Sequence, residues 1–294
     1  MRIGVAGLGL MGSGMATRLI RTGYRICVYN RDRSKAERFS GNADRASTPA
    51  ELADRCDFVI VAVTDFHAVQ EVLLGDNGVV KSENRDLIVA DASTISPSQS
   101  SQCARSLRSR GIEMLGMPVM GGPALAESGE LVPMVSGNRE SYDKVRTVIE
   151  QLGKPVFYIG PTDGAANAIK LALNLNIALV ASAVSEGITL VRSSGIDPSL
   201  FLQVLNSTYF KTGLSEKKGP KMIDGDFQPT FHLKNMLKDL ELAAATAQER
   251  KISLPQTILA QQIFRAANNS GFSEMDYTAI CAFLAKINGM DRPR

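Results

Sequence analysis

The stretch that decides the fold is Gly7-Leu8-Gly9-Leu10-Met11-Gly12, together with the segments on either side of it. An apolar, β-branched run, Arg2 to Ala6, comes directly before the glycines, and a helical pattern, Met11 to Thr22, begins within them. A second apolar run, Tyr24 to Tyr29, follows the helix. This order predicts a strand, a tight turn, a helix and a second strand, which is the start of a parallel βαβ unit.

Each glycine of the turn has its own physical reason. Gly7 permits the sharp turn, Gly9 lets the backbone approach a pyrophosphate, and Gly12 lets the helix pack closely against the strand. The helix that opens here also offers free backbone amides to phosphate groups. The sequence therefore predicts a dinucleotide site formed by Gly7, Leu8, Gly9, Leu10, Met11 and Gly12. A glycine-rich turn that holds no ligand is the alternative.

Short apolar runs continue to alternate with helical stretches through the first half of the chain, and one such helix is expected from Arg33 to Ser40. This alternation predicts a Rossmann-type α/β fold, with a doubly wound and mainly parallel sheet. The further strand candidates are Asp57 to Val63, Leu87 to Asp91, Ile112 to Gly116, Leu131 to Ser136 and Val156 to Ile159.

The pattern changes after Gly160-Pro161-Thr162-Asp163-Gly164, where helical periodicity replaces the strand-like runs. We therefore expect two domains, a dinucleotide-binding domain over residues 1–162 and an all-α domain over residues 163–294. A long apolar helix is expected from Ala165 to Ser193, ending near Gly195, and Asp197-Pro198 is a typical start for the next helix.

The apolar side chains of that long helix occupy more than one face, so other helices must cover them. The covering helices come either from the same chain or from a second subunit, and we expect a homodimer or homotetramer. Lys170, Asn174 and Asn176 interrupt the apolar run. We therefore interpret it as a helix buried in protein, with no membrane partner.

Composition excludes several classes of partner. The 33 basic and 30 acidic side chains give a net charge of +3, too small and too evenly spread to predict a nucleic-acid or membrane surface. The four cysteines lie far apart, with no metal-ligand spacing, so we expect buried free thiols and no metal. The chain begins directly in a strand pattern, without the features of a secretory signal, and a cytoplasmic location is expected.

The end of the second strand predicts which dinucleotide is bound. An NAD(H) site usually has an acidic residue about twenty positions after the glycines, whereas a 2′-phosphate favours arginine. The sequence here is Asn30-Arg31-Asp32-Arg33. Asn30 replaces the acid, Arg31 can pair with a phosphate and lie on the adenine, and Arg33 can add a second charge. We expect NADP(H) to be preferred over NAD(H). The alternative is an exposed helix start with Asp32 as its N-cap.

Lys170 and Asn174 are the candidate reacting residues. They are four positions apart within the apolar run, and therefore lie on one face of the expected helix. A lysine buried without a carboxylate partner should have a lowered pKa, which suits a group that exchanges a proton near neutral pH. The alternative is a lysine whose amine reaches from the helix end to water.

Five blocks in order along the chain resemble the β-hydroxyacid dehydrogenase family. That family includes 3-hydroxyisobutyrate dehydrogenase, tartronate semialdehyde reductase and the glyoxylate or succinic semialdehyde reductases. Together the blocks cover nearly the whole chain. They are the glycine turn, Asp91-Ala-Ser-Thr94-Ile-Ser-Pro97, Met117-Pro-Val-Met-Gly-Gly122, the Gly164 to Asn174 segment and Lys238-Asp239-Leu240.

The resemblance implies hydride transfer between a nicotinamide and a small, carboxylate-bearing hydroxy acid or aldehyde acid. Lys170 would then be the general acid and base, with Asn174 holding the substrate beside it. The resemblance also implies a carboxylate cradle formed by the amides of Gly121 and Gly122. The cofactor contacts that it implies are Val63, Thr64, Thr94 and Lys238, with Asp239 behind them.

One block departs from the family pattern Asp-x-Pro-Val-Ser-Gly-Gly. This chain has Gly116 in place of the acid and Met120 in place of the serine. A thioether is apolar and a weak acceptor, so the pocket loses a polar anchor. Either the substrate has a more apolar head group, or Met120 packs beneath the nicotinamide and the glycine amides bind substrate unaided.

Two rival functions follow from these observations. An imine reductase of the same architecture fits the altered Met120 loop, but such enzymes commonly lack the lysine. A non-catalytic NADP(H)-sensing module fits the glycine turn alone, although the presence of Lys170 and Asn174 favours an enzyme.

Overall fold

The computed structural model describes residues 1–290. Two compact units make up the chain, one ending at Lys170 and the other beginning at Leu171, so the division lies inside the long helix α8 (Ala165–Ser193). The boundary expected after residue 162 stays a prediction.

Unit 1 is built on a nine-stranded sheet with the order β3-β2-β1-β4-β5-β6-β8-β7, and β9 pairs with β8. The strands from β3 to β6 are all parallel, whereas β8 runs antiparallel to both β6 and β7. The predicted doubly wound, mainly parallel sheet is confirmed. The strands are β1 (Arg2–Ala6), β2 (Arg25–Tyr29), β3 (Asp44–Arg45), β4 (Phe58–Val61), β5 (Ile88–Asp91), β6 (Glu113–Gly116), β7 (Val119–Met120), β8 (Val132–Ser136) and β9 (Phe157–Gly160).

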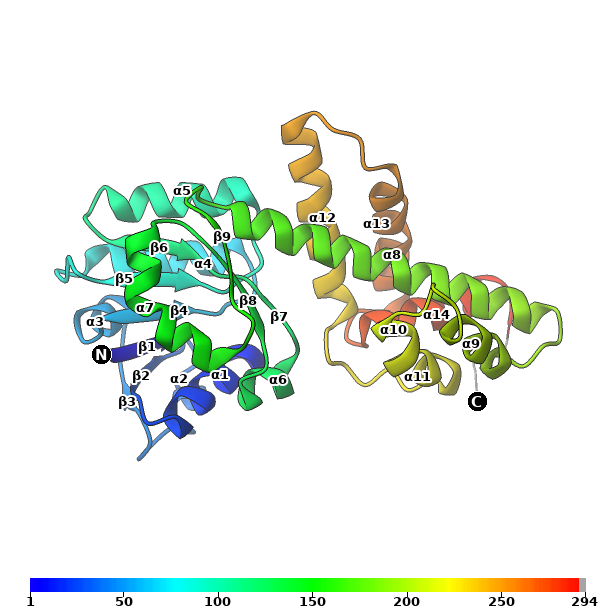
Figure 1. The fold of residues 1–294 in the computed structure, drawn as a ribbon, viewed down its shortest axis with the longest axis horizontal. Helices are drawn as coiled ribbons and strands as arrows, with labels where there is room; N and C mark the ends of the chain where they lie inside the picture. The colour runs from blue at the N-terminus through cyan, green and yellow to red at the C-terminus, as the bar shows by residue number, and fades with distance from the viewer. Residues whose placement is uncertain (291–294) are drawn as a thin grey trace. The chain divides into compact units, whose positions relative to one another are not determined.

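Helices cover both faces of this sheet and bury an apolar core on each (Figure 1). Buried aliphatic runs in the central strands supply the sheet side of both cores, as expected for parallel strands covered on two faces. One face packs against α1 (Leu10–Arg21), α2 (Arg33–Glu37), α6 (Pro123–Ser128) and α7 (Arg139–Leu152). The other packs against α3 (Pro49–Asp54), α4 (Phe66–Leu74), η1 (Val79–Lys81) and α5 (Pro97–Arg108).

The regular structure of unit 2 from Leu171 to Met290 consists of helices, apart from one isolated β-bridge between His232 and Asp276, which confirms the expected helical C-terminal region. It packs α8 against a layer of shorter helices around two apolar clusters (Figure 1). These helices are α9 (Pro198–Asn206), α10 (Gly213–Lys217), α11 (Gly219–Asp224), α12 (Leu233–Arg250), α13 (Pro255–Ala267), η2 (Asn268–Phe272), η3 (Tyr277–Ala279) and α14 (Ile280–Ile287).

The long helix α8 has the bounds predicted from its apolar run. Gly195 follows its end with φ of +72°, a left-handed conformation that glycine adopts without strain. Asp197 then caps α9, because its carboxylate accepts a hydrogen bond from the amide of Ser199 at 2.9 Å. The local signals around this helix are therefore sufficient to define it.

The described residues leave part of the apolar surface of α8 exposed. Ile169, Leu173 and Leu190 have exposed fractions of 37%, 37% and 67%. Among the described residues, α8 is also the one helix long and apolar enough to cross a membrane, a test that core helices of soluble proteins pass as well. An apolar surface of this kind needs a cover, whatever its source.

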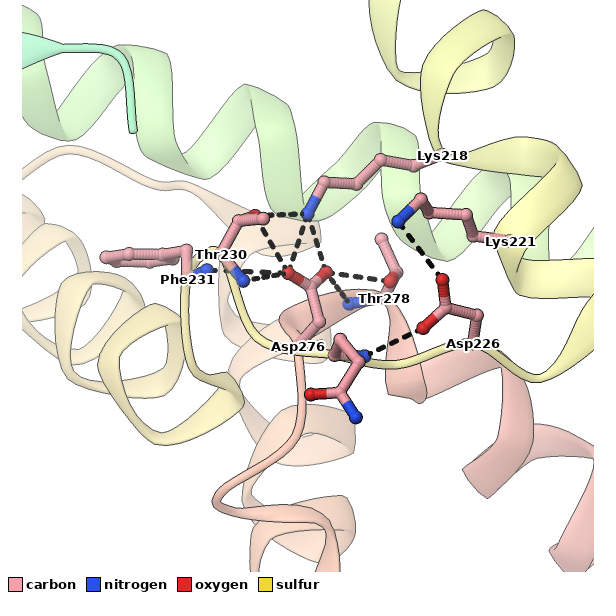
Figure 2. Close-up of polar contacts among 8 residues, drawn as sticks. Lys218, Lys221, Asp226, Thr230, Phe231, Asp276 and Thr278 are labelled. Atoms are coloured by element: carbon pink, nitrogen blue, oxygen red, sulfur yellow. Dashed lines mark hydrogen bonds and ion pairs between the residues drawn. The ribbon is translucent and has the colours of Figure 1, made fainter. Parts of the chain in front are cut away.

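A buried ion pair ties together the loops of unit 2. The carboxylate of Asp276 is 3% exposed and accepts hydrogen bonds from the amine of Lys218, 2.7 Å from each carboxylate oxygen. Thr230 and Thr278 add donors from two further segments, as Figure 2 shows. Burial raises the pKa of Asp276, but the hydrogen bonds from Lys218 and Thr230 outweigh it, and the net pKa is lowered.

Candidate functional site

The glycine turn has the three features that a pyrophosphate site needs. Gly7 has φ of +93°, and a Cβ there would lie 2.3 Å from the carbonyl oxygen of Ala62. A Cβ on Gly12 would lie 1.8 Å from the carbonyl oxygen of Gly7. By contrast, a Cβ on Gly9 would meet nothing within 4 Å. Two glycines therefore permit the close packing, and the third leaves backbone open to a ligand. The residues present fit a dinucleotide.

Asn30 holds this turn against the end of β2. Its side-chain oxygen accepts a hydrogen bond from the amide of Leu8 at 2.8 Å, and its amide nitrogen donates to the carbonyl of Asp32 at 2.9 Å. The amide of Gly7 also donates to the carbonyl of Tyr29 at 2.9 Å. The sequence shows only that position 30 carries no acid. The side chain there also shapes the turn, a role visible only once β1 and β2 are paired.

The basic residues after β2 face solvent. Arg31 and Arg33 are exposed, and their side chains make no hydrogen bond or ion pair with another residue of the described chain. Asp32 caps α2 by accepting a hydrogen bond from the amide of Ser34 at 3.1 Å, the N-cap role that the sequence offered as an alternative for this segment. The hydroxyl and the amide of Ser34 lower the pKa of Asp32. The capping role of Asp32 leaves both arginines available to an anionic ligand.

A cavity of about 480 Å³ opens beside the glycine turn. Two basic residues contribute to its lining, Lys35 of α2 and Arg38 at the end of that helix. The sequence contains a signal for this pair, because residues three positions apart share a face of the helix expected from Arg33 to Ser40. The rest of the lining is Leu8, Gly9, Leu10, Ser13, Gly14, Thr17, Pro123, Ala124 and Glu127.

The loops after β4 and β5 meet at the carboxyl edge of the sheet, where open α/β folds bind ligands. The amide of Val63 donates to the hydroxyl of Ser93 at 3.0 Å. Val63 is also a neighbour of the glycine turn, since a Cβ on Gly7 would lie 2.7 Å from its Cγ1. Thr64 is exposed and Thr94 is half-buried in these two loops. The structure therefore groups Val63, Thr64 and Thr94 near the turn, and their cofactor contacts stay predictions.

Lys170 lies against Met120. Its Nζ is 3.2 Å from the methionine sulfur, and both side chains are half-buried. Met120 ends β7 and leads into Gly121, which has φ of +127°. A Cβ on Gly121 would lie 2.7 Å from Leu131, whereas Gly122 has open space around it. Unit 1 thus brings the predicted acid and base beside the predicted carboxylate cradle.

The other departure from the family pattern, Gly116, has a packing explanation. A Cβ on Gly116 would lie 2.8 Å from the side-chain oxygen of Asn167, which is 1% exposed. Asn167 lies three positions before Lys170 and donates to the carbonyl of Ile95 at 3.4 Å. Asn167 therefore occupies the space that a side chain at position 116 would need. No local pattern in the sequence indicated this pair.

Within unit 2, Asn174, Asp239 and Lys238 form a buried chain of contacts. The amide nitrogen of Asn174 donates to Oδ2 of Asp239 at 2.5 Å, and the amine of Lys238 lies 3.0 Å from Oδ1. Asn174 and Asp239 are 4% and 2% exposed. The predicted substrate-holding residue thus has its orientation set by Asp239. Across residues 1–290, no group of three or more His, Cys, Asp or Glu side chains is placed to hold a metal ion.

Two family models together match most of the chain. The family model for the NAD binding domain of 6-phosphogluconate dehydrogenase matches residues 2–160. A second model, described as the NAD-binding region of NADP-dependent 3-hydroxyisobutyrate dehydrogenase, matches residues 164–284.

Two relatives and one solved structure cover nearly the whole chain. The 2-hydroxy-3-oxopropionate reductase of Escherichia coli K12 is 32% identical over 280 residues, 95% of this chain and 96% of that protein. Glyoxylate/succinic semialdehyde reductase 2 of Arabidopsis thaliana is 30% identical over 279 residues, 95% of this chain and 78% of that protein. The crystal structure of 3-hydroxyisobutyrate dehydrogenase from Salmonella typhimurium has a TM-score of 0.85 at 26% identity, covering 96% of this chain and 99% of that one. The chain therefore belongs to the β-hydroxyacid dehydrogenase family of nicotinamide-dependent oxidoreductases.

Proposed function

We propose that this protein is an NADP(H)-dependent reductase of small aldehyde acids, working in reverse as a hydroxyacid dehydrogenase. The observation that carries the proposal is the position of the Lys170 amine, 3.2 Å from Met120 and next to the Gly121-Gly122 turn. An amine beside a cradle of backbone donors can serve a substrate that has both a carboxylate and a reacting oxygen.

Lys170 moves the proton in this proposal. During reduction its ammonium group gives a proton to the carbonyl oxygen of the aldehyde acid as that oxygen becomes a hydroxyl. During oxidation the neutral amine takes the hydroxyl proton back. The bound nicotinamide supplies or accepts the hydride. An ammonium group has three donors and the thioether of Met120 is a weak acceptor, so a substrate oxygen can bond to the amine beside Met120.

The remaining site residues bind and orient. The amides of Gly121 and Gly122 hold the substrate carboxylate, and Asn174 holds the substrate beside Lys170. Asp239 accepts a hydrogen bond from the amide nitrogen of Asn174 and so fixes the orientation of that side chain. We also assign Val63, Thr64, Thr94 and Lys238 to the cofactor, at the nicotinamide end.

A preference for NADP(H) over NAD(H) is part of the proposal. Arg31 and Arg33 are exposed next to the glycine turn, and Lys35 and Arg38 line the adjoining cavity. Asn30 stands where an NAD(H) site usually has an acid, so no carboxylate at this position repels a 2′-phosphate. Four cations so placed favour a ligand that carries the extra phosphate.

We further propose that a second copy of the chain covers the exposed side of α8, giving a homodimer or homotetramer. Leu173 and Leu190 of α8, Leu200 and Val204 of α9 and Leu259 of α13 are all more than a third exposed. Sedimentation of the purified protein at micromolar concentration should give at least twice the mass of 31.6 kDa. A monomer would contradict this part. Four buried thiols suit the reducing cytoplasm that we propose as its location.

The test of the proposed function is turnover followed by NADPH absorbance. The substrates are glyoxylate, succinic semialdehyde, 2-hydroxy-3-oxopropionate and 2-methyl-3-oxopropionate, each with NADPH and with NADH. Turnover of at least one aldehyde acid with NADPH is expected. If only cyclic imines react, the protein is an imine reductase. Tight NADPH binding without turnover of any carbonyl or imine would make it a sensing module.

Arg31→Ala tests the cofactor preference. The dissociation constant for NADPH should rise at least tenfold, because a hydrogen bond to a charged group contributes about 1.5–3 kcal/mol. Affinity for NADH should stay within twofold. Arg25→Ala is the matched control, since Arg25 is exposed at the opposite end of the same strand. Equal weakening of NADPH and NADH by Arg31→Ala would contradict the assignment.

A further inference from the structure

The contact between Met120 and Lys170 is held from both sides by one strand. Val132 of β8 pairs with Met120. At the other end of β8, the hydroxyl of Ser136 accepts a hydrogen bond from the amide of Ala166 in the first turn of α8, at 3.1 Å. One strand thus fixes the backbone of the methionine and the start of the helix that carries the lysine. The position of the Met120 sulfur beside the Lys170 amine is therefore set by the packing of the sheet and the helix.

The sulfur is close enough to touch the substrate. An oxygen that bonds to the Lys170 amine lies about 3 Å from it, and therefore at most about 6 Å from a sulfur that is itself 3.2 Å away. A substituent on the carbon next to the reacting carbon lies about 3 Å from that oxygen. It meets the sulfur when the substrate carboxylate is held by Gly121 and Gly122, which directly follow Met120 in the chain. Met120 consequently lines the part of the pocket that receives those substituents.

A thioether and a hydroxyl would select different substrates at this place. The sulfur donates no hydrogen bond and accepts only weakly, but it packs well against a methyl or methylene group. A substrate hydroxyl there would be desolvated without a good partner. An apolar pocket discriminates against an added hydroxyl of equal size by up to about a hundredfold.

We infer that Met120 is a specificity-determining residue that makes this enzyme prefer aldehyde acids with hydrogen or an alkyl group on the carbon beside the reacting carbonyl, over those with a hydroxyl there. The inference deepens the proposed function and rests on it for the place where the substrate binds. The preferred substrates are thus the 2-alkyl or 2-unsubstituted 3-oxo acids and their 3-hydroxy products.

Two stable hydroxy acids of nearly equal shape test the inference. 3-Hydroxy-2-methylpropanoate and 2,3-dihydroxypropanoate differ only by a methyl or a hydroxyl on the second carbon. In wild type with NADP⁺, kcat/KM should be about tenfold to a hundredfold higher for the methyl compound. Met120→Ser should reduce or reverse that ratio by at least tenfold. Met120→Leu, which stays apolar, should keep it.

Met275→Ser is the matched control, because Met275 is 38% exposed in unit 2 and takes no part in the site. It should leave the ratio unchanged. The inference is overturned if wild type treats both acids alike, or if Met120→Ser leaves the ratio within twofold. Calorimetric binding of the two acids to the NADPH-bound protein supplies the same ratio independently of turnover. A wild-type protein that turns over neither acid nor any aldehyde would overturn the proposed function, while the affinity ratio still decides the role of Met120.

Discussion

Two lysines of this protein have opposite surroundings. In unit 2, the amine of Lys218 donates to both oxygens of Asp276 at 2.7 Å and to the hydroxyl of Thr230 at 2.8 Å (Figure 2). The same amine lies 4.4 Å from the ring centre of Tyr277. In unit 1, the amine of Lys170 lies 3.2 Å from the thioether of Met120.

The difference separates a lysine that stabilises the fold from the lysine for which we propose a catalytic role. All three donors of Lys218 are used by strong acceptors, so displacing any of them would leave a buried carboxylate undersatisfied. A thioether is a much weaker acceptor than a carboxylate, so the contact with Met120 holds the Lys170 amine less firmly. A structural lysine can therefore be distinguished from a ligand-binding one by the strength of the hydrogen bonds that its amine would give up when it binds a ligand.

The largest effect should come from Lys170→Met. Loss of a general acid and base lowers turnover by about 100- to 10,000-fold, whereas affinity for NADPH should not change. The thermal midpoint should stay within a few degrees of wild type, because Met keeps the unbranched apolar stem of this half-buried side chain. Steady-state kinetics, NADPH titration and thermal melts measure the three quantities. Near-normal turnover would show that Lys170 carries no proton.

Lys218→Met should have the reverse profile. Removing one partner of a buried ion pair lowers the free energy of unfolding by about 3–5 kcal/mol. Urea denaturation should show this loss, while kcat of the fraction that remains folded is preserved. Lys217→Met is the matched control, since Lys217 is the exposed neighbour in sequence, and its effect should be below about 0.5 kcal/mol. Similar losses in both variants would remove the distinction drawn between the two lysines.

An intermediate effect is expected at Asp239, which contacts both Asn174 and Lys238. Asp239→Ala leaves the buried amide of Asn174 without its acceptor and should destabilise the protein by about 1–3 kcal/mol. Asp239→Asn retains an oxygen for that amide and should lose less. Equal losses would mean that the ion pair with Lys238, and not the hydrogen bond to Asn174, stabilises this region.

The smallest effect concerns pH. Since the pKa of Asp276 is lowered in the folded protein, its contribution to stability is complete above the usual aspartate value of about 3.9 and is lost as pH falls through the lower folded value. The difference in unfolding free energy between wild type and Asp276→Asn should therefore be constant from pH 7 to about 5 and shrink below pH 4. A difference that stays constant down to pH 3 would contradict the assigned direction.

Most of the sheet could be predicted from apolar runs, with ends that differ by one or two residues. The strands that escaped prediction, β3 (Asp44–Arg45) and β7 (Val119–Met120), have two residues each. So short a strand has no periodicity of its own and is defined by its partner, as Val132 defines Met120. The antiparallel direction of β8 was likewise invisible, because pairing direction depends on the route of the chain and not on the strand residues.

The candidate site divides in the same way. The glycine turn, the capping role of Asp32 and the full extent of α8 follow from local rules, since each depends on residues within a few positions of one another. Asn30 as a clamp on Leu8, and Asn167 as the reason for Gly116, required contacts across 22 positions or more.

Sequence alone thus determined where backbone must turn, open and coil, because glycine torsions, helix caps and apolar periodicity act over one or two turns of chain. Only the tertiary structure decided what each functional side chain faces. Met120 and Lys170 are separated by 50 positions, and Lys218 and Asp276 by 58. The groups that an amine meets are set by which distant strands and loops pack together, and local sequence patterns do not contain that information.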